Sequence, residues 1–185
     1  MQRLEPFVTP IWIAIAVATT AVASLATQQY EPAPKYVGVS HCEQCHGSEG
    51  TGRQVQKWRA GPHGQAWQRL ASPEAAAVAK RLGVEDPQTA PECLRCHTTG
   101  AGLPKTSFAK SFDALDGVQC ESCHGPGERY AKIEHMIMSA QAKELGLIDP
   151  SPRVCKQCHN ENSPTYEGFD YRTAIKKIEH ALAPY

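Results

Sequence analysis

The sequence predicts a mostly α-helical fold of short helices and loops, preceded by an N-terminal transmembrane helix or signal segment. Fourteen glycines and fourteen prolines among 185 residues indicate many turns between short elements. Hydrophobic residues make up 41% of the chain and aromatic residues 7%, which is little for a core made of protein alone. A bound cofactor with apolar surface of its own would complete such a core. The third observation is a short cysteine motif that recurs along the chain.

The first element is an apolar segment from Ile11 to Ala26, and only Arg3 and Glu5 carry charge before it. A secretory signal needs a basic start, a short apolar stretch and small residues before its cleavage site. A membrane-spanning helix needs about twenty apolar residues, and Phe7 to Ala26 supplies a stretch of that kind. We therefore predict that residues 1–28 are an export segment, retained as a membrane anchor, with a cleaved signal as the alternative.

The charge before this segment predicts the compartment. Arg3 and the terminal amine favour a cytoplasmic N-terminus, with the rest of the chain outside the cytoplasm. The predicted location is the bacterial cytoplasmic membrane with the folded domain in the periplasm; a cleaved signal would instead give a soluble periplasmic protein. Residues 29–35 are polar and contain proline, as in a semi-rigid linker. The folded domain is predicted over residues 36–185.

All eight cysteines lie in four CxxCH motifs, and none is left over. Cysteines three positions apart lie on one face of a helical turn, where both sulfurs reach a single porphyrin. The histidine that follows then binds the iron as its proximal ligand. We therefore predict four covalently attached haem c groups. The attachment residues are Cys42, Cys45, Cys93, Cys96, Cys120, Cys123, Cys155 and Cys158, and the proximal ligands are His46, His97, His124 and His159.

Two other uses of paired cysteines are disfavoured. Pairs of CxxC build four-cysteine zinc sites, but zinc does not require a histidine after every pair. A redox-active disulfide within CxxC normally occurs once and within a βαβ pattern, which this chain does not display. The fourfold repeat in an exported chain favours haem.

Four further histidines are available for the opposite faces of the irons. A haem with two histidine ligands needs one of them. His63 opens a helical pattern that runs to Ala71, and His135 lies in a longer one from Glu128 to Leu145 that Gly146 ends. His180 lies in a closing helix with Ala174, Ile178, Ala181 and Leu182 on its inward face. We predict His63, His135 and His180 as distal ligands.

The fourth of these histidines, His41, directly precedes Cys42 and is too close to reach the far face of its own haem. It is either a ligand of a neighbouring haem or a solvated loop residue, and the second interpretation is favoured. Met136 and Met138 share a predicted helix with His135, so core packing is favoured over iron binding. Three distal histidines for four irons leave one haem open.

Several remaining residues mark element boundaries. Ser72-Pro73-Glu74 predicts a helix start, with serine as the N-cap, and Gly83 predicts its end. Gly125-Pro126-Gly127 is expected to end the third attachment helix. The aromatic residues Trp58, Trp67 and Tyr130 pack either on porphyrin faces or in an ordinary core.

The run from Gly117 to Gly127 (GVQCESCHGPG), together with Trp58 and His63-Gly64-Gln65-Ala66, resembles the cytochrome c-554 family, tetrahaem electron carriers of hydroxylamine oxidation. The similarity covers most of residues 36–183. It implies a mostly α-helical fold around closely packed haems. Three haems would have two histidine ligands and one, at Cys93, Cys96 and His97, would be five-coordinate. The implied partners are His135 for the first haem, His180 for the third and His63 for the fourth.

The predicted function is electron transfer in a respiratory or related chain, because almost all identifiable motifs hold haem. The expected partners are redox proteins or a larger membrane complex. Lysine and arginine balance aspartate and glutamate at nineteen each, so nothing indicates a nucleic acid. One alternative is an enzyme that reduces a small nitrogen species at the five-coordinate haem, although no group for acid-base chemistry is identifiable. Another is a haem-bearing docking subunit of a membrane assembly.

Overall fold

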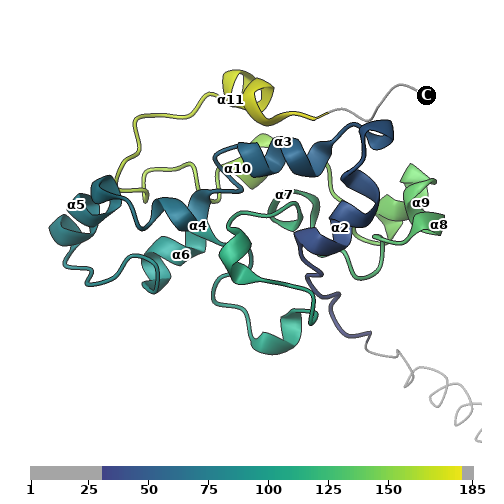
Figure 1. Cartoon of the computed structure of the whole chain (residues 1–185), viewed down its shortest axis with the longest axis horizontal. Helices are drawn as coiled ribbons and strands as arrows, with labels where there is room; N and C mark the ends of the chain where they lie inside the picture. The colour runs from purple at the N-terminus through teal and green to yellow at the C-terminus, as the bar shows by residue number, and fades with distance from the viewer. Residues whose placement is uncertain (1–30, 181–185) are drawn as a thin grey trace, which may run out of the picture. The chain divides into compact units, whose positions relative to one another are not determined.

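The computed structural model describes residues 31–180, and those from Pro34 onward form one unit. Within these residues the regular structure is helical, with a single isolated bridge between Tyr36 and Phe108 and no strand. The predicted mostly α-helical class is confirmed. The α-helices (Figure 1) are α2 (Val39–His46), α3 (Gln54–Ala60), α4 (Ala66–Arg69), α5 (Pro73–Leu82), α6 (Pro91–His97), α7 (Glu121–His124), α8 (Ile133–Met136), α9 (Ser139–Glu144), α10 (Pro152–Cys155) and α11 (Tyr171–Ile178).

Helix α5 begins and ends at the residues that the sequence predicts. The Ser72 hydroxyl accepts a hydrogen bond from the Ala75 amide at 3.2 Å, and Pro73 occupies the first helical position. Gly83 follows the last turn with φ 69°, a left-handed conformation that glycine adopts without strain. Both boundary predictions are confirmed.

The predicted helix from Glu128 to Leu145 is instead two short helices, α8 and α9. The chain turns before α8 because the buried Tyr130 hydroxyl reaches back and donates to the Gly125 carbonyl at 2.7 Å. Between the two helices, Met138 has a non-helical backbone (φ −120°, ψ 89°), so α8 does not continue into α9. The long helix was therefore a wrong prediction.

Two predicted distal ligands lie just outside the helices to which the sequence assigns them. His63 precedes α4, in a turn where Gly64 approaches the Trp58 carbonyl so closely that a Cβ would lie 2.7 Å from it. His180 lies beyond α11, because Glu179 leaves the helix with ψ 140°. Residues 181–182, expected on the inward face of that helix, lie outside the described residues.

The apolar core of the described residues is small, as the composition predicts. Its members are Val37, Val39, Val55, Ala66, Leu70, Ala79, Tyr130 and Ala142. Polar side chains are buried beside them. Gln119, 1% exposed, accepts a hydrogen bond from the Val39 amide at 2.8 Å and donates to the Asp113 carbonyl, while its own amide donates to the Thr99 hydroxyl at 2.7 Å. Gln119 thus joins the segments that carry the first three CxxCH motifs.

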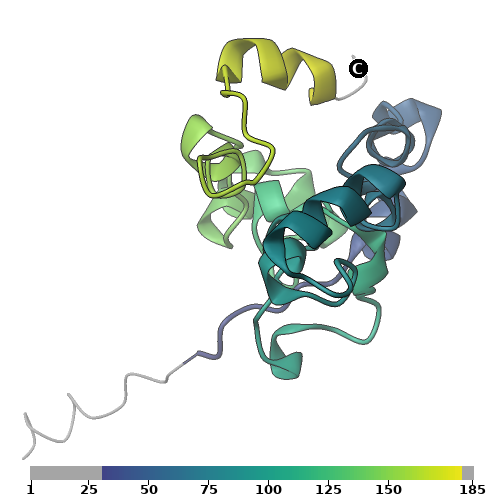
Figure 2. The same ribbon diagram turned by 90° about the vertical axis from the view of Figure 1, so that its left-hand side faces the viewer.

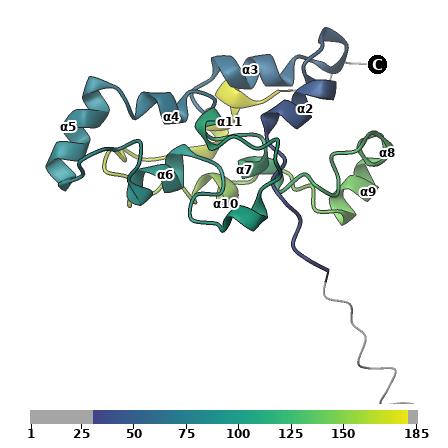
Figure 3. The ribbon, with the colours of Figure 1, turned by 60° about the horizontal axis from the view of Figure 1, so that its bottom comes forward.

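The helices are distributed along the domain in an order that differs from the sequence. Figures 1 and 3 place α5 and α6 at one end and α8 and α9 at the other. Figure 2 shows α11, in yellow, as a separate segment reached by an extended connection. The Tyr171 hydroxyl donates to the Pro150 carbonyl at 3.2 Å, and the Lys57 ammonium of α3 donates to the Glu179 carbonyl. These contacts hold α11 at its two ends.

No helix within residues 31–180 combines the length and apolar character needed to cross a membrane. The predicted anchor or signal segment, residues 1–28, lies outside the described residues, as do the first two residues of the predicted linker.

Candidate functional site

Each of the four CxxCH motifs lies on a helical turn. The first and second motifs lie within α2 and α6. In the third, Cys120 caps α7 and its carbonyl accepts from the His124 amide at 2.9 Å. In the fourth, α10 ends at Cys155, whose carbonyl accepts from the His159 amide at 3.0 Å. Each turn brings two thiols and an imidazole to one local surface, the arrangement that covalent haem attachment requires.

The eight cysteines are free thiols, and thiols of different motifs lie close enough together to affect one another's pKa. The Cys42 and Cys120 thiols share a hydrogen bond, which together with burial raises the pKa of Cys42. Burial raises the pKa of Cys158 to about 12, with a further contribution from its neighbour Cys96.

The third motif also lies near the fourth. Burial raises the pKa of Cys123 to about 11, and the proximity of Cys155 adds to this shift. The first attachment site therefore adjoins the third, the third adjoins the fourth, and the fourth adjoins the second.

Four of the predicted ligand histidines use the same ring nitrogen in a hydrogen bond to the backbone. A carbonyl only accepts, so Nδ1 carries the proton and the lone pair of Nε2 is free to bind a metal. The pairs are His97 with Ala66 (2.7 Å), His135 with Arg129 (2.8 Å), His124 with Ile148 (3.2 Å) and His180 with Ile178 (3.2 Å). The backbone thus fixes the tautomer that an iron ligand needs.

Two pairs of histidine rings are in edge contact at the same centroid distance. The ring centroids of His63 and His159 lie 6.1 Å apart at 60°, and those of His124 and His180 lie 6.1 Å apart at 68°. A metal holds an imidazole nitrogen at about 2 Å, so two imidazoles on opposite sides of one ion have centroids about 6 Å apart. Ordinary aromatic pairs span about 4.5 to 7 Å, but each pair here joins a CxxCH histidine to a predicted distal histidine.

The charge state of these rings also suits a metal. Burial lowers the pKa of His63, and the nearby His159 lowers it further. Burial lowers the pKa of His159 and that of His124 as well. A lowered pKa keeps the imidazole neutral, and only the neutral ring binds a metal.

The position of His63 depends on a glycine of the GVQC run. The Val118 amide donates to the His63 carbonyl at 3.0 Å. Gly117 has φ 75°, and a Cβ there would lie 2.9 Å from the same carbonyl oxygen. Glycine is therefore required for the third motif to pack against the segment that carries His63.

His46 and His135 are not in ring contact with each other in the described part of the chain. The buried Nδ1 of His46 has no hydrogen-bond partner, and His135 is half-buried at the start of the α8 and α9 segment. His46 thus has a ring nitrogen without a hydrogen bond, and the Nδ1 bond of His135 leaves its Nε2 available to a metal.

His41 differs from the other histidines, because its Nε2 is engaged with the Ala131 carbonyl at 3.0 Å. It is half-buried within α2, so the interpretation as a solvated loop residue was wrong. Core packing was also wrong for Met138, which is 52% exposed, whereas Met136 is half-buried. Of the aromatic residues, Tyr130 lies in the core, Trp58 and Trp67 are half-buried, and the Trp58 indole donates to the Val118 carbonyl at 2.7 Å.

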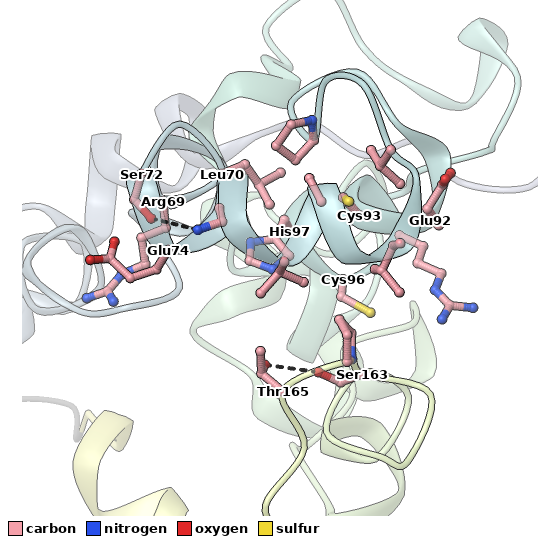
Figure 4. A pocket seen from close by; sticks show the side chains of 18 of the residues that line it. Arg69, Leu70, Ser72, Glu74, Glu92, Cys93, Cys96, His97, Ser163 and Thr165 are labelled. Carbon is pink, nitrogen blue, oxygen red and sulfur yellow. Dashed lines mark hydrogen bonds between the residues drawn. The ribbon is translucent and has the colours of Figure 1, made fainter.

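A cavity of about 580 Å³ adjoins the second motif. Figure 4 shows Cys93, Cys96 and His97 of α6 on one side of it and Ser163 and Thr165 on another. Apolar side chains of α5, among them Val78 and Leu82, complete the lining. Among the described residues that line this cavity, His97 is the only histidine and there is no methionine.

Phe169 is a contributor to the site that the sequence analysis missed. Its ring stacks on that of His159, with centroids 4.8 Å apart and planes 15° from parallel. A lone phenylalanine in a loop carries no sequence signal for such a role. The stack fixes the plane of the His159 ring.

Comparison with known proteins gives concordant matches. The family described as cytochrome c554 and c-prime matches residues 25–125. Cytochrome c-554 of Nitrosomonas europaea is 31% identical over 152 residues, which cover 80% of this chain and 62% of that protein. The chain thus spans less than two thirds of the length of this relative. The solved structure of reduced cytochrome c554 from Nitrosomonas europaea has a similar fold, with a TM-score of 0.53, 23% identity and 79% of each chain covered.

Proposed function

Because the chain belongs to the cytochrome c554 and c-prime family, we propose that it is a four-haem c-type cytochrome that carries electrons between redox partners. Haem iron supplies the redox chemistry, since it takes up and releases single electrons. The observation that carries the proposal is the pair of 6.1 Å histidine contacts, His63 with His159 and His124 with His180. Each contact opposes a CxxCH histidine to a histidine from a remote segment, as a bis-histidine haem requires.

The residues have three roles in this proposal. The eight cysteines attach the porphyrins, and His46, His97, His124 and His159 are the proximal ligands. His63 and His180 are the distal ligands of the fourth and third haems. The resemblance to the family implies that His135 is the distal ligand of the first haem, and its Nδ1 bond to the Arg129 carbonyl leaves Nε2 free for that role. The second haem keeps an open position.

The adjacency of the thiols orders the attachment sites as first, third, fourth and second. The neighbouring pairs are Cys42 with Cys120, Cys123 with Cys155, and Cys96 with Cys158. The first and second sites are the two ends of this row. One redox partner is therefore expected to dock near α2 and the other near α6, and the donor can be at either end.

Haem content and redox titration test this function. Intact-protein mass spectrometry should give four covalently bound haems, and a spectroelectrochemical titration should resolve four one-electron transitions. Substitution of both cysteines of one motif should remove one haem and one transition. A wild-type protein with fewer than four haems, or without transitions in a physiological range, would contradict the proposal.

The predicted N-terminal segment completes the proposal. We propose that residues 1–28 export the chain and tether it to the cytoplasmic membrane, where redox proteins or a larger membrane complex exchange electrons with it. The apolar run from Ile11 to Ala26 supports this. N-terminal sequencing and membrane fractionation of the mature protein are the test. A cleaved, freely soluble periplasmic protein would contradict the membrane tether and leave the proposed electron-carrier function standing.

A second candidate function is reduction of a small nitrogen species at the second haem. The 580 Å³ cavity beside Cys93, Cys96 and His97 favours it, because none of the described lining residues offers a second axial ligand. The ferrous protein should bind carbon monoxide at one haem only. Steady turnover of nitric oxide with a chemical reductant would support an enzyme, whereas binding without turnover would support the carrier.

A further inference from the structure

Glu121 is a buried carboxylate that the electron-transfer proposal leaves unexplained. Its side chain is 2% exposed. Its oxygens accept three main-chain hydrogen bonds, from the amides of Val37 (2.8 Å), Gly38 (2.8 Å) and Gly127 (2.7 Å). Within residues 31–180 no lysine or arginine forms an ion pair with it.

Three amide donors suit an ionised carboxylate. A buried carboxyl group normally resists ionisation, but several N–H donors directed at its oxygens favour the charged form. A residue without a side chain is needed next to this carboxylate. A Cβ at Gly127 would lie 3.2 Å from Oε1 of Glu121 and 3.0 Å from Val37. The glycine that ends the GVQCESCHGPG run thus gives its amide access to the carboxylate.

Glu121 lies beside two attachment sites at once. It follows Cys120 directly and precedes Cys123 by two positions. Through Oε2 it binds the Gly38 amide, and the Gly38 carbonyl lies 3.6 Å from the Cys42 thiol. Its charge contributes to the raised pKa of Cys42, after the hydrogen bond to Cys120 and burial. It also contributes to the raised pKa of the buried Tyr130, after burial.

We propose that Glu121 is a fixed negative charge that lowers the reduction potentials of the haems attached at Cys42/Cys45 and Cys120/Cys123. The inference rests on the proposed function. Reduction adds one electron from an external donor to ferric iron and gives ferrous iron. A negative charge in a poorly solvated interior disfavours that addition. The step transfers an electron and no proton.

The other motifs provide a matched comparison at the same position. The residue after the first cysteine is Glu43, Leu94, Glu121 and Lys156 in the four motifs. Glu43 is solvated at the surface and forms a two-pronged ion pair with Arg59, at 3.0 Å for both contacts. Water and the guanidinium screen its charge. Glu43 therefore has the chemistry of Glu121 without its burial.

The experiment is spectroelectrochemical titration of the full-length holoprotein and three variants. In Glu121→Gln, the oxidised-to-reduced ratio of two haems at a fixed potential should fall about tenfold, which corresponds to about 59 mV for a one-electron couple. The other two haems should shift much less. Glu121→Asp keeps the charge and should titrate like the wild type, and Glu43→Gln should leave all transitions unchanged.

Four titration results would overturn the inference. The first is an equal shift in Glu121→Gln and Glu43→Gln, and the second is a uniform shift of all four haems. The third is the same shift in Glu121→Asp as in Glu121→Gln, which would indicate displaced backbone and not charge. The fourth is a Glu121→Gln variant whose potentials equal those of a wild type with four transitions, which would contradict this inference alone. A wild type without transitions would contradict the proposed function.

Infrared difference spectra of the wild type keep the test independent of variant folding. Reduction of the haems should perturb the carboxylate stretching bands and produce no band of a protonated carboxyl group. A protonated carboxyl band that changes as the first and third haems are reduced would overturn the fixed charge.

Discussion

The imidazole rings of His63 and His159 are in edge contact with centroids 6.1 Å apart, although one precedes α4 and the other ends the fourth CxxCH motif. The relationship is maintained from both sides. The Val118 amide holds the His63 carbonyl, and Phe169 stacks on the His159 ring. A single site is thus assembled from three segments that are distant in the sequence.

His63→Ala should convert one haem from low spin to high spin, because it removes the ring that opposes His159. Electron paramagnetic resonance of the oxidised protein measures the change, and mass spectrometry should still give four haems. His41→Ala is the control, since its Nε2 is engaged with the Ala131 carbonyl. The same high-spin signal in both variants would contradict the assignment of His63.

Lys57→Gln should weaken the ligation by His180, because the Lys57 ammonium donates to the Glu179 carbonyl next to it. We expect a high-spin fraction at the third haem and little change in overall stability. Lys177→Gln, an exposed lysine on α11, is the matched control. Identical spectra for the two variants would show that Lys57 does not position His180.

Ser72→Ala should destabilise the protein by about 1 kcal/mol, the usual cost of losing a serine N-cap. The substitution leaves the Ala75 amide without its acceptor at the start of α5. Denaturant unfolding of the holoprotein measures the loss. Ser72→Asp preserves the cap and should stay close to the wild type, so equal losses in both variants would refute the capping role.

Tyr130→Phe should cost about 1 to 3 kcal/mol at neutral pH, because the buried Gly125 carbonyl loses its donor. Denaturant unfolding measures the loss, and Tyr166→Phe, at an exposed tyrosine, is the control.

The same tyrosine predicts a dependence on pH. Burial, and then the charge of Glu121, raises the pKa of Tyr130 in the folded state above the ordinary value of about 10. Its contribution to stability is complete below that value and is lost as pH rises above it. The wild type should therefore lose stability above pH 10 more steeply than Tyr130→Phe. Parallel pH profiles would refute this.

The sequence alone predicts the features that depend on local spacing. The CxxCH turns follow from the three-residue separation of their cysteines, and the bounds of α5 follow from Ser72 and Gly83. The mostly α-helical class and the small apolar core follow from composition and from the many glycines and prolines.

Features that depend on contacts beyond the local spacing of residues could not be predicted from the sequence. The break between α8 and α9 lies at Met138, whose backbone is not helical, and the turn before α8 is held by the Tyr130 hydroxyl, which binds the Gly125 carbonyl. The pairing of His124 with His180 depends on how the Lys57 side chain and Tyr171 hold α11. Residue spacing contains neither contact, so only the resemblance to a known family suggested that pairing.

The hydrogen bonds of Gln119 have a consequence for how this protein changes over evolutionary time. Both bonds of its side chain go to main-chain atoms, the Val39 amide and the Asp113 carbonyl. A substitution at Val39 or Asp113 changes the side chain and keeps these main-chain atoms. The spacing of the attachment segments therefore does not depend on the side chains at those two positions. The exterior can therefore change in sequence while the attachment segments keep their spacing.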